Sequence, residues 1–353
     1  MPHPITVMLK TLEQSDAFFC VACGHDRGSA AVAARPPEKP FELWRCDGCG
    51  LVQQFPRWNP ARINSLYGDD YYVFSEKEEH RWARAVQQYV VHLARFESSF
   101  TQAARVGTAQ RRSASNAIAN CQGPRLLDVG CALGHLAALA RMRGWRVTGV
   151  DISADAISQA AVRFGLDVRA GNLSSHVGTL APYDVVLLGD VIEHVPDPVR
   201  FLNDVKKVLL PGGTVCIDTP NWGGRWRRWG RSSWLGLNRF HVNLFDADCL
   251  ARLLSTCGFR DIAAASYTHY RYEGWSTRPE LQAIVRKLPS FLSWRIIHFL
   301  ENRKSTTRWS PLRERAPANM DDALARLAEL GPSAAPTVRT NLVGDNLVMT
   351  ARR

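Results

Sequence analysis

Four cysteines near the amino terminus have the types and spacing of a metal site. Cys20 and Cys23 form one C-x-x-C pair, and Cys46 and Cys49 form a second. Four thiolates on two tight turns suit tetrahedral Zn²⁺, and a site whose positions are all filled by protein is structural rather than catalytic. The alternatives are a redox dithiol, four unrelated core cysteines, or a site in which His25 competes with a thiolate.

Cysteine usage also bears on the cellular compartment. The chain has nine cysteines, an odd number, and four of them lie in the two pairs. This usage favours metal binding in a reducing compartment over disulfides. Residues 1–20 lack the basic start and apolar centre of a secretory signal, and no run of about 18 apolar residues is present. We expect a cytoplasmic protein, with peripheral contact at the inner membrane face as a further hypothesis.

A second group of residues has the spacing of a nucleotide-binding turn. Gly130 and Gly134 follow an apolar strand that ends at Asp128, and Asp151 ends the next strand. An acid about 20 residues beyond a glycine turn typically binds ribose hydroxyls. The dinucleotide pattern G-x-G-x-x-G would need a second glycine at Ala132, where a methyl group crowds a pyrophosphate. The spacing therefore favours a ligand without phosphates.

The elements that position these residues form a strand–helix–strand unit. The helix is expected over 134–143, between the strand that ends at Asp128 and a strand over 145–150. Its amino terminus would offer free N–H groups and a positive dipole to a carboxylate. Such a unit predicts a doubly wound α/β sheet.

The order of the motifs resembles that of class I S-adenosylmethionine-dependent methyltransferases. The resemblance implies a Rossmann-like, doubly wound α/β fold with a seven-stranded sheet. Ala132 departs from the pattern, because many members carry glycine there. The segments that carry the resemblance are 126–134 (the glycine turn), 183–198 (strand four and its turn), 208–221 (around strand five), 240–259 (before strand six) and 344–351 (the last strand).

The same resemblance assigns cofactor contacts. The methionyl carboxylate of S-adenosylmethionine would lie at the amino terminus of the helix, and Asp151 would accept the ribose hydroxyls. Ile152 would face adenine, and Asn172 would accept from its amino group. Asp190 and Val191 would lie beside the reactive methyl. The complete predicted set is Asp128, Gly130, Ala132, Gly134, Asp151, Ile152, Asn172, Asp190 and Val191.

Methyl transfer needs an aligned acceptor and, for some acceptors, a group that takes a proton. His241 and His194 are the main candidate bases, because imidazole titrates near neutral pH. Glu193 and Asp190 are further candidates. Two alternatives stay open: His194 stabilises its turn, or the methyl is transferred without a side-chain base.

The front segment carries a second resemblance. Certain methyltransferases, including a group that acts on sugars, have a similar zinc ribbon followed by C-G-L-V, a proline and an L-Y-x-x-x-Y-Y element. This chain has them at 49–52, Pro56 and 66–72. The resemblance implies that the front segment faces the substrate, with Tyr71 as a substrate-binding candidate.

Five segments make up the predicted organisation. Trp82, Val86 and Tyr89 recur at helical spacing in the second of them. An apolar, arginine-flanked stretch over 281–300 in the fourth predicts either an interfacial helix pair or a cover over the active site. The segments are a zinc ribbon (1–60), a helical connector or lid (61–120), the Rossmann-like core (121–270), a basic amphipathic helical insert (271–336) and the final core strand (337–353).

Positive charge is concentrated late in the chain. The net charge is +11, and residues 222–315 hold 17 Lys or Arg against 7 Asp or Glu, a difference of +10. Such a region favours anionic partners. Within it, Trp226, Arg228 and Trp229 are substrate-binding candidates, because alternating Trp and Arg stack on flat or sugar ligands. Membrane contact and simple packing on the core are the alternatives.

These observations predict S-adenosylmethionine-dependent O- or C-methylation of a small molecule, sugar or glycoconjugate, with an anionic acceptor favoured. The alternative is an RNA-modifying methyltransferase that grips nucleic acid with the ribbon and the basic region. Residues 1–60 hold 6 basic and 6 acidic residues, so the ribbon has no electrostatic footprint for RNA. The sequence predicts no oligomeric state.

Overall fold

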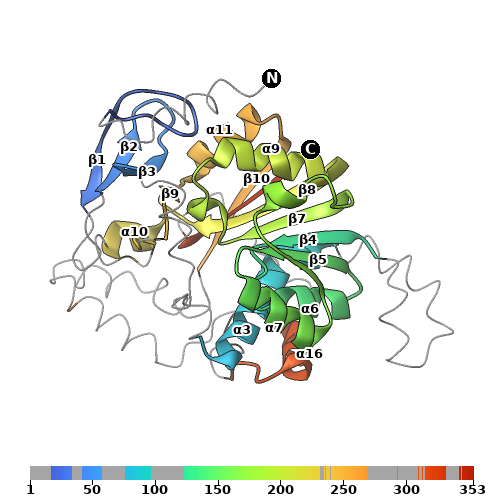
Figure 1. Ribbon diagram of the computed structural model, residues 1–353. Coiled ribbons are helices and arrows are strands. Elements are labelled where there is room, and N and C mark those ends of the chain that lie inside the picture. The colour runs from blue at the N-terminus through green and yellow to red at the C-terminus, as the bar shows by residue number, and fades with distance from the viewer. Residues whose placement is uncertain are drawn as a thin grey trace.

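A seven-stranded mixed sheet forms the centre of the computed structural model (Figure 1). Its order is β10-β11-β8-β7-β4-β5-β6. The five strands β8, β7, β4, β5 and β6 run parallel, and β11 is antiparallel to both of its neighbours, β10 and β8. This sheet confirms the predicted α/β methyltransferase fold. The strands are β4 (Arg125–Val129), β5 (Arg146–Asp151), β6 (Asp167–Ala170), β7 (Tyr183–Gly189), β8 (Leu209–Pro220), β10 (Arg260–Tyr267) and β11 (Asn346–Arg352).

The structure describes a defined part of the chain. This part comprises residues 17–33, 42–57, 76–96, 123–230, 234, 236–238, 240–268, 292, 309, 312, 315–330, 342 and 344–353, without the side chains of 226, 229 and 230. Several predicted features lie outside it. They are Tyr71 with the rest of 58–75, the side chains of Trp226 and Trp229, and the stretch 281–300 apart from Leu292.

Helices cover both faces of the large sheet (Figure 1). Successive residues of a strand point to opposite faces, so that Leu126 packs in one core cluster and Leu127 in the other. Each buried leucine of this kind contributes about 1.5–3 kcal/mol. On one face lie α3 (Glu78–Gln88), α6 (His135–Met142), α7 (Ala154–Phe164) and α16 (Met320–Leu330), and on the other lie α9 (Pro198–Val208) and α11 (Ala247–Thr256).

Local sequence signals set the helix ends. The Ser153 side chain accepts the backbone N–H of Ala156 at the start of α7, and Gly165 ends that helix in the left-handed conformation. Asp197 caps α9 in the same way, with Pro198 in its first turn. These signals place the strand-to-helix turns, and therefore the side chains that follow each parallel strand.

Helix α3 confirms the helix predicted around Trp82. It continues through a π-helix, η3 (Tyr89–Leu93), and a 3-10 turn, η4 (Ala94–Phe96). Glu78 fixes its start to the core, because the carboxylate pairs with His135 of α6 at 2.9 Å and with Arg163 of α7 at 2.9 Å. This anchoring holds α3 across the carboxyl ends of the parallel strands.

A small second sheet contains the front segment. Its order is β1-β2-β3-β9, with β1 (Gly28–Ala33), β2 (Glu42–Cys46), β3 (Val52–Phe55) and β9 (Asn243–Leu244). Strand β9 belongs to the later part of the chain, and Arg252 of α11 donates to the Cys49 carbonyl at 2.8 Å. The front segment is therefore joined to the core by a backbone ladder, a contact that the sequence did not predict.

None of the helices in the described part of the chain has the length and apolar character needed to cross a membrane.

Candidate active site and four-cysteine centre

One cavity of about 410 Å³ opens at the carboxyl ends of β4, β5 and β7. Strands β5 and β6 extend to one side of β4, and β7 and β8 to the other, so the cavity lies where the strand order reverses. Ligands of open α/β sheets bind at such a switch point. The cavity brings together every residue of the predicted cofactor set, namely Asp128, Gly130, Ala132, Gly134, Asp151, Ile152, Asn172, Asp190 and Val191.

The two glycines of the turn are required by geometry. Gly130 has φ +76°, and a Cβ there would lie 2.5 Å from Val191 Cγ2. Gly134 has φ +77°, and a Cβ there would lie 2.7 Å from Leu166 Cδ1. Gly134 is also the N-cap of α6, so the amino terminus of this helix lies at the cavity wall, as the sequence predicted.

Ala132 occupies a backbone conformation that favours glycine. Its φ is +46°, in the left-handed region, where an alanine costs about 1–2 kcal/mol. Part of this cost is offset because glycine loses more backbone entropy on folding. We expect Ala132→Gly to raise the free energy of unfolding by about 0.5–1 kcal/mol, measured by urea denaturation. Gly134→Ala is the matched control and must destabilise; a loss of stability in Ala132→Gly would contradict the strain.

Asp151 is buried and partly committed to backbone donors. Its Oδ2 accepts the Ala132 N–H at 2.9 Å and its Oδ1 accepts the Ser153 N–H at 2.9 Å. The Ile152 backbone N–H is a third donor, and burial raises the pKa of Asp151 in spite of these hydrogen bonds. The carboxylate lines the cavity, so its remaining acceptor capacity is available to a ligand hydroxyl such as that of a ribose.

Asp128 stands behind the turn, fully enclosed. Burial, together with the nearby charge of Asp151, raises its pKa to about 7. The native state therefore retains a proton on Asp128 between about pH 4 and pH 7 that the unfolded state releases. The contribution of this group to stability is consequently present at low pH and is lost as the pH rises through this range.

We expect Asp128→Asn to remove that loss, because an amide does not ionise. The difference in unfolding free energy between variant and wild type should shift in favour of the variant by on the order of 3 kcal/mol from about pH 4 to about pH 8. Urea unfolding of the cofactor-free protein at the two pH values measures this shift. Equal pH slopes in the two proteins would show that Asp128 titrates normally.

The remaining predicted cofactor residues differ in environment. Asp190 follows β7 with φ +54°, and burial and the charge of Asp218 raise its pKa to about 7. Acids with strained backbones and raised pKa values of this kind cluster at functional sites. Ile152 is an apolar side chain with 40% exposure at the cavity, which leaves its surface available to a flat ring. Asn172 is the N-cap of α8 (Leu173–His176).

Helix α3 supplies cavity residues that the sequence analysis missed. Arg81, Arg84 and Gln88 line the cavity opposite the strand ends. Arg84 pairs with Glu76 at 2.9 Å. From α9, Arg200 adds another positive charge to the wall. The apolar spacing of α3 predicted a helix, but only its packing on α6 shows which polar residues face the cavity.

The two candidate bases lie together, at different depths. His194, in the 3-10 turn η6 (Ile192–His194), lines the cavity, whereas His241 packs behind it with ring centroids 4.8 Å apart. Burial lowers the pKa of His194 to about 4, and burial and the neighbouring His194 lower the pKa of His241 well below its usual value. His194 is therefore the one of the two that a cavity ligand reaches directly.

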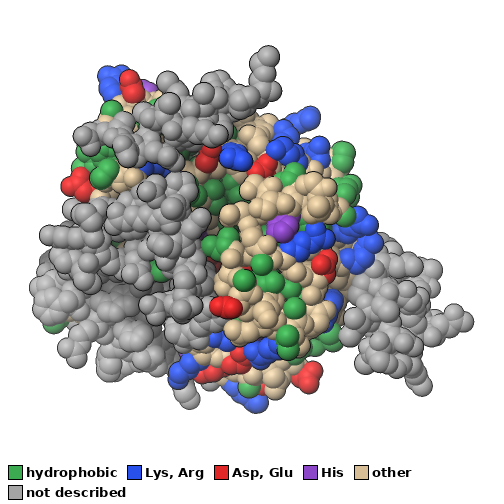
Figure 2. Space-filling view, in the orientation of Figure 1, with side chains coloured by type: hydrophobic (Ala, Val, Ile, Leu, Met, Phe, Trp, Pro, Cys, Tyr) green, Lys and Arg blue, Asp and Glu red, His purple; other side chains and the backbone are tan. Residues whose placement is uncertain are grey.

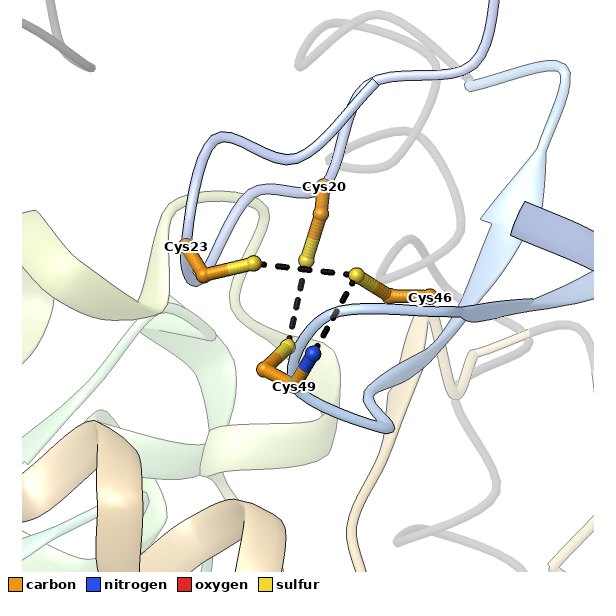
Figure 3. Close-up of side chains that lie close together, drawn as sticks. All are labelled: Cys20, Cys23, Cys46 and Cys49. Atoms are coloured by element: carbon orange, nitrogen blue, oxygen red, sulfur yellow. Dashed lines mark hydrogen bonds between the residues drawn. The ribbon is translucent and has the colours of Figure 1, made fainter. Parts of the chain in front are cut away.

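The four cysteines converge as predicted (Figure 3). The Cys20 and Cys49 sulfurs are 3.4 Å apart, and those of Cys23 and Cys46 are 3.6 Å apart. Tetrahedral Zn²⁺ with Zn–S bonds of about 2.3 Å requires sulfur separations of about 3.8 Å. The donor set and its size thus fit zinc.

The two cysteine turns have matching backbones. Gly24 donates to the Cys20 carbonyl at 2.9 Å, and Gly50 donates to the Cys46 carbonyl at 3.0 Å, each with positive φ. Cys20 and Cys46 lie deepest. Hydrogen bonds from the Cys20 and Cys249 thiols lower the pKa of Cys49 to about 2. His25 is not part of the described cluster, whose members are the four cysteines.

Residues 222–234, in which Trp and Arg alternate, are described only in part. They include α10 (Arg225–Gly230), in which Arg228 is exposed and Arg227 lies over the Trp222 ring at 3.9 Å. Trp234 is buried, with its ring centroid 6.1 Å from that of Trp222. These two tryptophans are buried and pack against each other, in keeping with the packing alternative that the sequence analysis gave for this region.

Comparison with known proteins agrees with this geometry. The family model described as "Methyltransferase domain" matches residues 103–264. Residues 103–264 are therefore similar in sequence to a methyltransferase domain. The chain is 35% identical over 140 residues to a Mycolicibacterium smegmatis protein named "Probable S-adenosylmethionine-dependent methyltransferase". It is 40% identical over 106 residues to a Caulobacter sp. protein named "Ubiquinone biosynthesis O-methyltransferase".

These matches cover part of each protein. They span 39% and 28% of this chain, and 53% and 42% of the relatives, so the chain spans about half the length of the curated relatives it matches. A solved S-adenosylmethionine-dependent methyltransferase from Archaeoglobus fulgidus is 17% identical, with a TM-score of 0.42, and the alignment covers 73% of this chain and 98% of that one. The methyltransferase domain is therefore defined by its sequence matches and by its strand order.

Proposed function

We propose that the protein binds S-adenosylmethionine in the cavity and transfers its methyl group to a small-molecule, sugar or glycoconjugate acceptor. The observation that carries this proposal is the single cavity that all nine predicted cofactor residues line. Residues from three separate strand ends converge there with the required chemistry: an N-terminal helix end, a ribose acceptor and an apolar platform.

The cavity offers a suitable group for each part of the cofactor. The amino terminus of α6 would receive the methionyl carboxylate, and the Asp151 carboxylate would accept hydrogen bonds from the ribose hydroxyls. Ile152 and Asn172 would hold the adenine. When bound, the cofactor supplies an activated methyl on a sulfonium, so the chain itself must orient an acceptor and exclude water.

The acceptor would enter along the wall formed by Asp190, Val191 and His194. Arg84 and Arg200 line this part of the cavity, but Arg84 pairs with Glu76 and the lining also carries acids such as Asp190 and Asp197. The anionic acceptor therefore stays a prediction from the sequence. A hydroxyl acceptor would release its proton at the His194 side of the cavity. The name of the Caulobacter relative, a ubiquinone biosynthesis O-methyltransferase, supports O-methylation.

The described residues on the face drawn in Figure 2 give no support to the RNA alternative. Figure 2 shows blue and red side chains interspersed over the described part of one face, without a continuous basic stripe. Proteins that bind the phosphate backbone of nucleic acids typically carry such a stripe. We therefore retain the small-molecule or glycoconjugate acceptor, with a cytoplasmic location and peripheral membrane contact as predictions.

The four-cysteine centre is proposed to hold one structural Zn²⁺, in the predicted ribbon at 1–60. The distances between the sulfurs support this assignment. Because β3 pairs with β9, a bound ion would also help to hold the segment that carries His241 in place.

Two measurements test the proposed function. Calorimetry with S-adenosylmethionine and S-adenosylhomocysteine should give saturable binding at one site per chain. Incubation with radiolabelled methyl donor and a panel of nucleotide sugars, phenols, glycolipids and RNA should label a member of one of the first three classes. Absence of cofactor binding would refute the proposal, and label confined to RNA would replace the acceptor class.

A further inference from the structure

Behind the cavity wall, three metal-ligating side chains converge. The ligand atoms of Glu193, His194 and His241 all lie within 4.8 Å of one another. Glu193 and His194 come from η6, and His241 comes from the segment just before β9. Two imidazoles and one carboxylate form the ligand set of several catalytic metal sites that keep open positions.

The carboxylate is half satisfied. Glu193 is fully buried, and its Oε2 accepts the Thr219 hydroxyl at 2.9 Å. Its Oε1 is buried without a hydrogen-bond partner and lies 3.8 Å from His194 Nε2. A buried, unpartnered carboxylate oxygen is costly unless it meets a cation or a donor. The oxygen that needs a partner is thus the one that faces the histidines.

Backbone carbonyls orient both imidazoles. The Phe240 carbonyl accepts from His194 Nδ1 at 2.9 Å, and the Gly236 carbonyl accepts from His241 Nδ1 at 3.0 Å. Because a carbonyl only accepts, both Nδ1 atoms carry the proton and both Nε2 atoms present a lone pair. Metal-binding histidines are held in this manner, with the far nitrogen donating to a carbonyl or carboxylate.

The Asn238 amide is the other polar neighbour of His241. Its Nδ2 lies 3.3 Å from Nδ1 and 3.1 Å from Nε2 of the ring. An atom almost equidistant from the two nitrogens lies off the in-plane lone pair of either. The Asn238 amide is therefore shared between the two ring nitrogens rather than directed at Nε2 alone.

We propose that Glu193 Oε1, His194 Nε2 and His241 Nε2 bind one divalent first-row transition-metal ion at the wall of the cavity. Ligand bonds of about 2.1 Å put neighbouring donors about 3.0–3.4 Å apart. The 3.8 Å distance between Glu193 Oε1 and His194 Nε2 must therefore shorten by less than about an ångström, and the other separations, all within 4.8 Å, by less than about 2 Å. Three protein ligands leave positions open, and His194 lines the cavity, so these positions face the proposed acceptor side.

This site deepens the proposed function, on which its role in catalysis rests. An ion there would bind the oxygen of a hydroxyl acceptor and lower its pKa, which favours the alkoxide that attacks the methyl. His194 would then act as a ligand, while the acceptor proton would leave to water.

Manganese titration of the chelator-treated holoprotein tests the site. Thiolates prefer zinc, so Mn²⁺ reports on the nitrogen and oxygen ligands rather than on the four cysteines. The electron paramagnetic resonance signal of free Mn²⁺ should show one bound ion per wild-type chain. Glu193→Gln, which preserves shape, and His241→Ala should each weaken binding at least about 10-fold. His176→Ala, which removes a half-buried histidine outside the cluster, should leave it unchanged.

The outcomes separate this inference from the proposed function. Calorimetry with S-adenosylhomocysteine on the same samples reports on the cofactor site and on folding. Cofactor binding without Mn²⁺ binding, or Mn²⁺ binding that is equal in all variants, overturns the metal site and leaves the proposed function intact. Mn²⁺ binding without cofactor binding supports the metal site and refutes the proposed function.

Discussion

Replacing Asp151 with alanine is expected to weaken binding of S-adenosylhomocysteine at least about 100-fold, because two hydrogen bonds to a buried carboxylate are worth about 1.5–3 kcal/mol each. Calorimetry measures this loss directly. The expectation rests on the place of this buried carboxylate in the cavity lining, where the backbone donors Ala132 and Ser153 hold it in position. An affinity close to that of the wild type would place the ribose elsewhere in the cavity.

The same substitution also frees two backbone N–H groups, so folding must be separated from binding. Asp155→Ala is a suitable control, since Asp155 is an exposed acid in the first turn of α7 and its loss changes the net charge equally. Asp151→Asn keeps the side-chain shape and one carbonyl oxygen, and it should bind with intermediate affinity. Thermal unfolding of the three proteins shows whether the turn survives.

Local patterns made the fold and the cofactor set predictable. The strand that contains Asp128 and the glycine turn after it both depend on neighbours within a few residues, so the sequence places them to within a residue. Gly130 and Gly134 are required because of contacts with Val191 and Leu166, yet their spacing alone identified them.

The other contacts at the cavity could not be predicted from the sequence, because they depend on packing between segments that are far apart in the chain. Arg84 reaches the cavity only because Glu78 pins α3 to His135 and Arg163. His194 and His241 are 47 positions apart and meet because Val242 pairs with the Glu193 carbonyl and β9 joins β3. The sequence analysis ranked these histidines separately and could not show that they form one cluster with Glu193.

Removal of zinc from the four-cysteine centre is expected to unfold the small sheet while the methyltransferase core stays folded. Apparent binding free energies of structural Zn²⁺ are about 10–16 kcal/mol, as large as the stability of a whole domain. Cys46→Ser should lower the zinc content by one ion per chain in elemental analysis. It should also expose β1 to β3 to proteolysis, because Cys46 ends β2 and its sulfur accepts the Cys49 N–H at 3.5 Å.

Cys249→Ser is the matched control for the zinc centre, because this buried thiol contacts Cys49 but lies outside the cluster of four. It should keep its zinc and its resistance to proteolysis. The cavity-lining residues begin at Glu76, after the ribbon, so Cys46→Ser should still bind S-adenosylhomocysteine, within about 10-fold of the wild type. A metal-free wild-type protein with an intact small sheet would refute the zinc assignment, whereas loss of cofactor binding in Cys46→Ser would show that the ladder between β3 and β9 also supports the cavity.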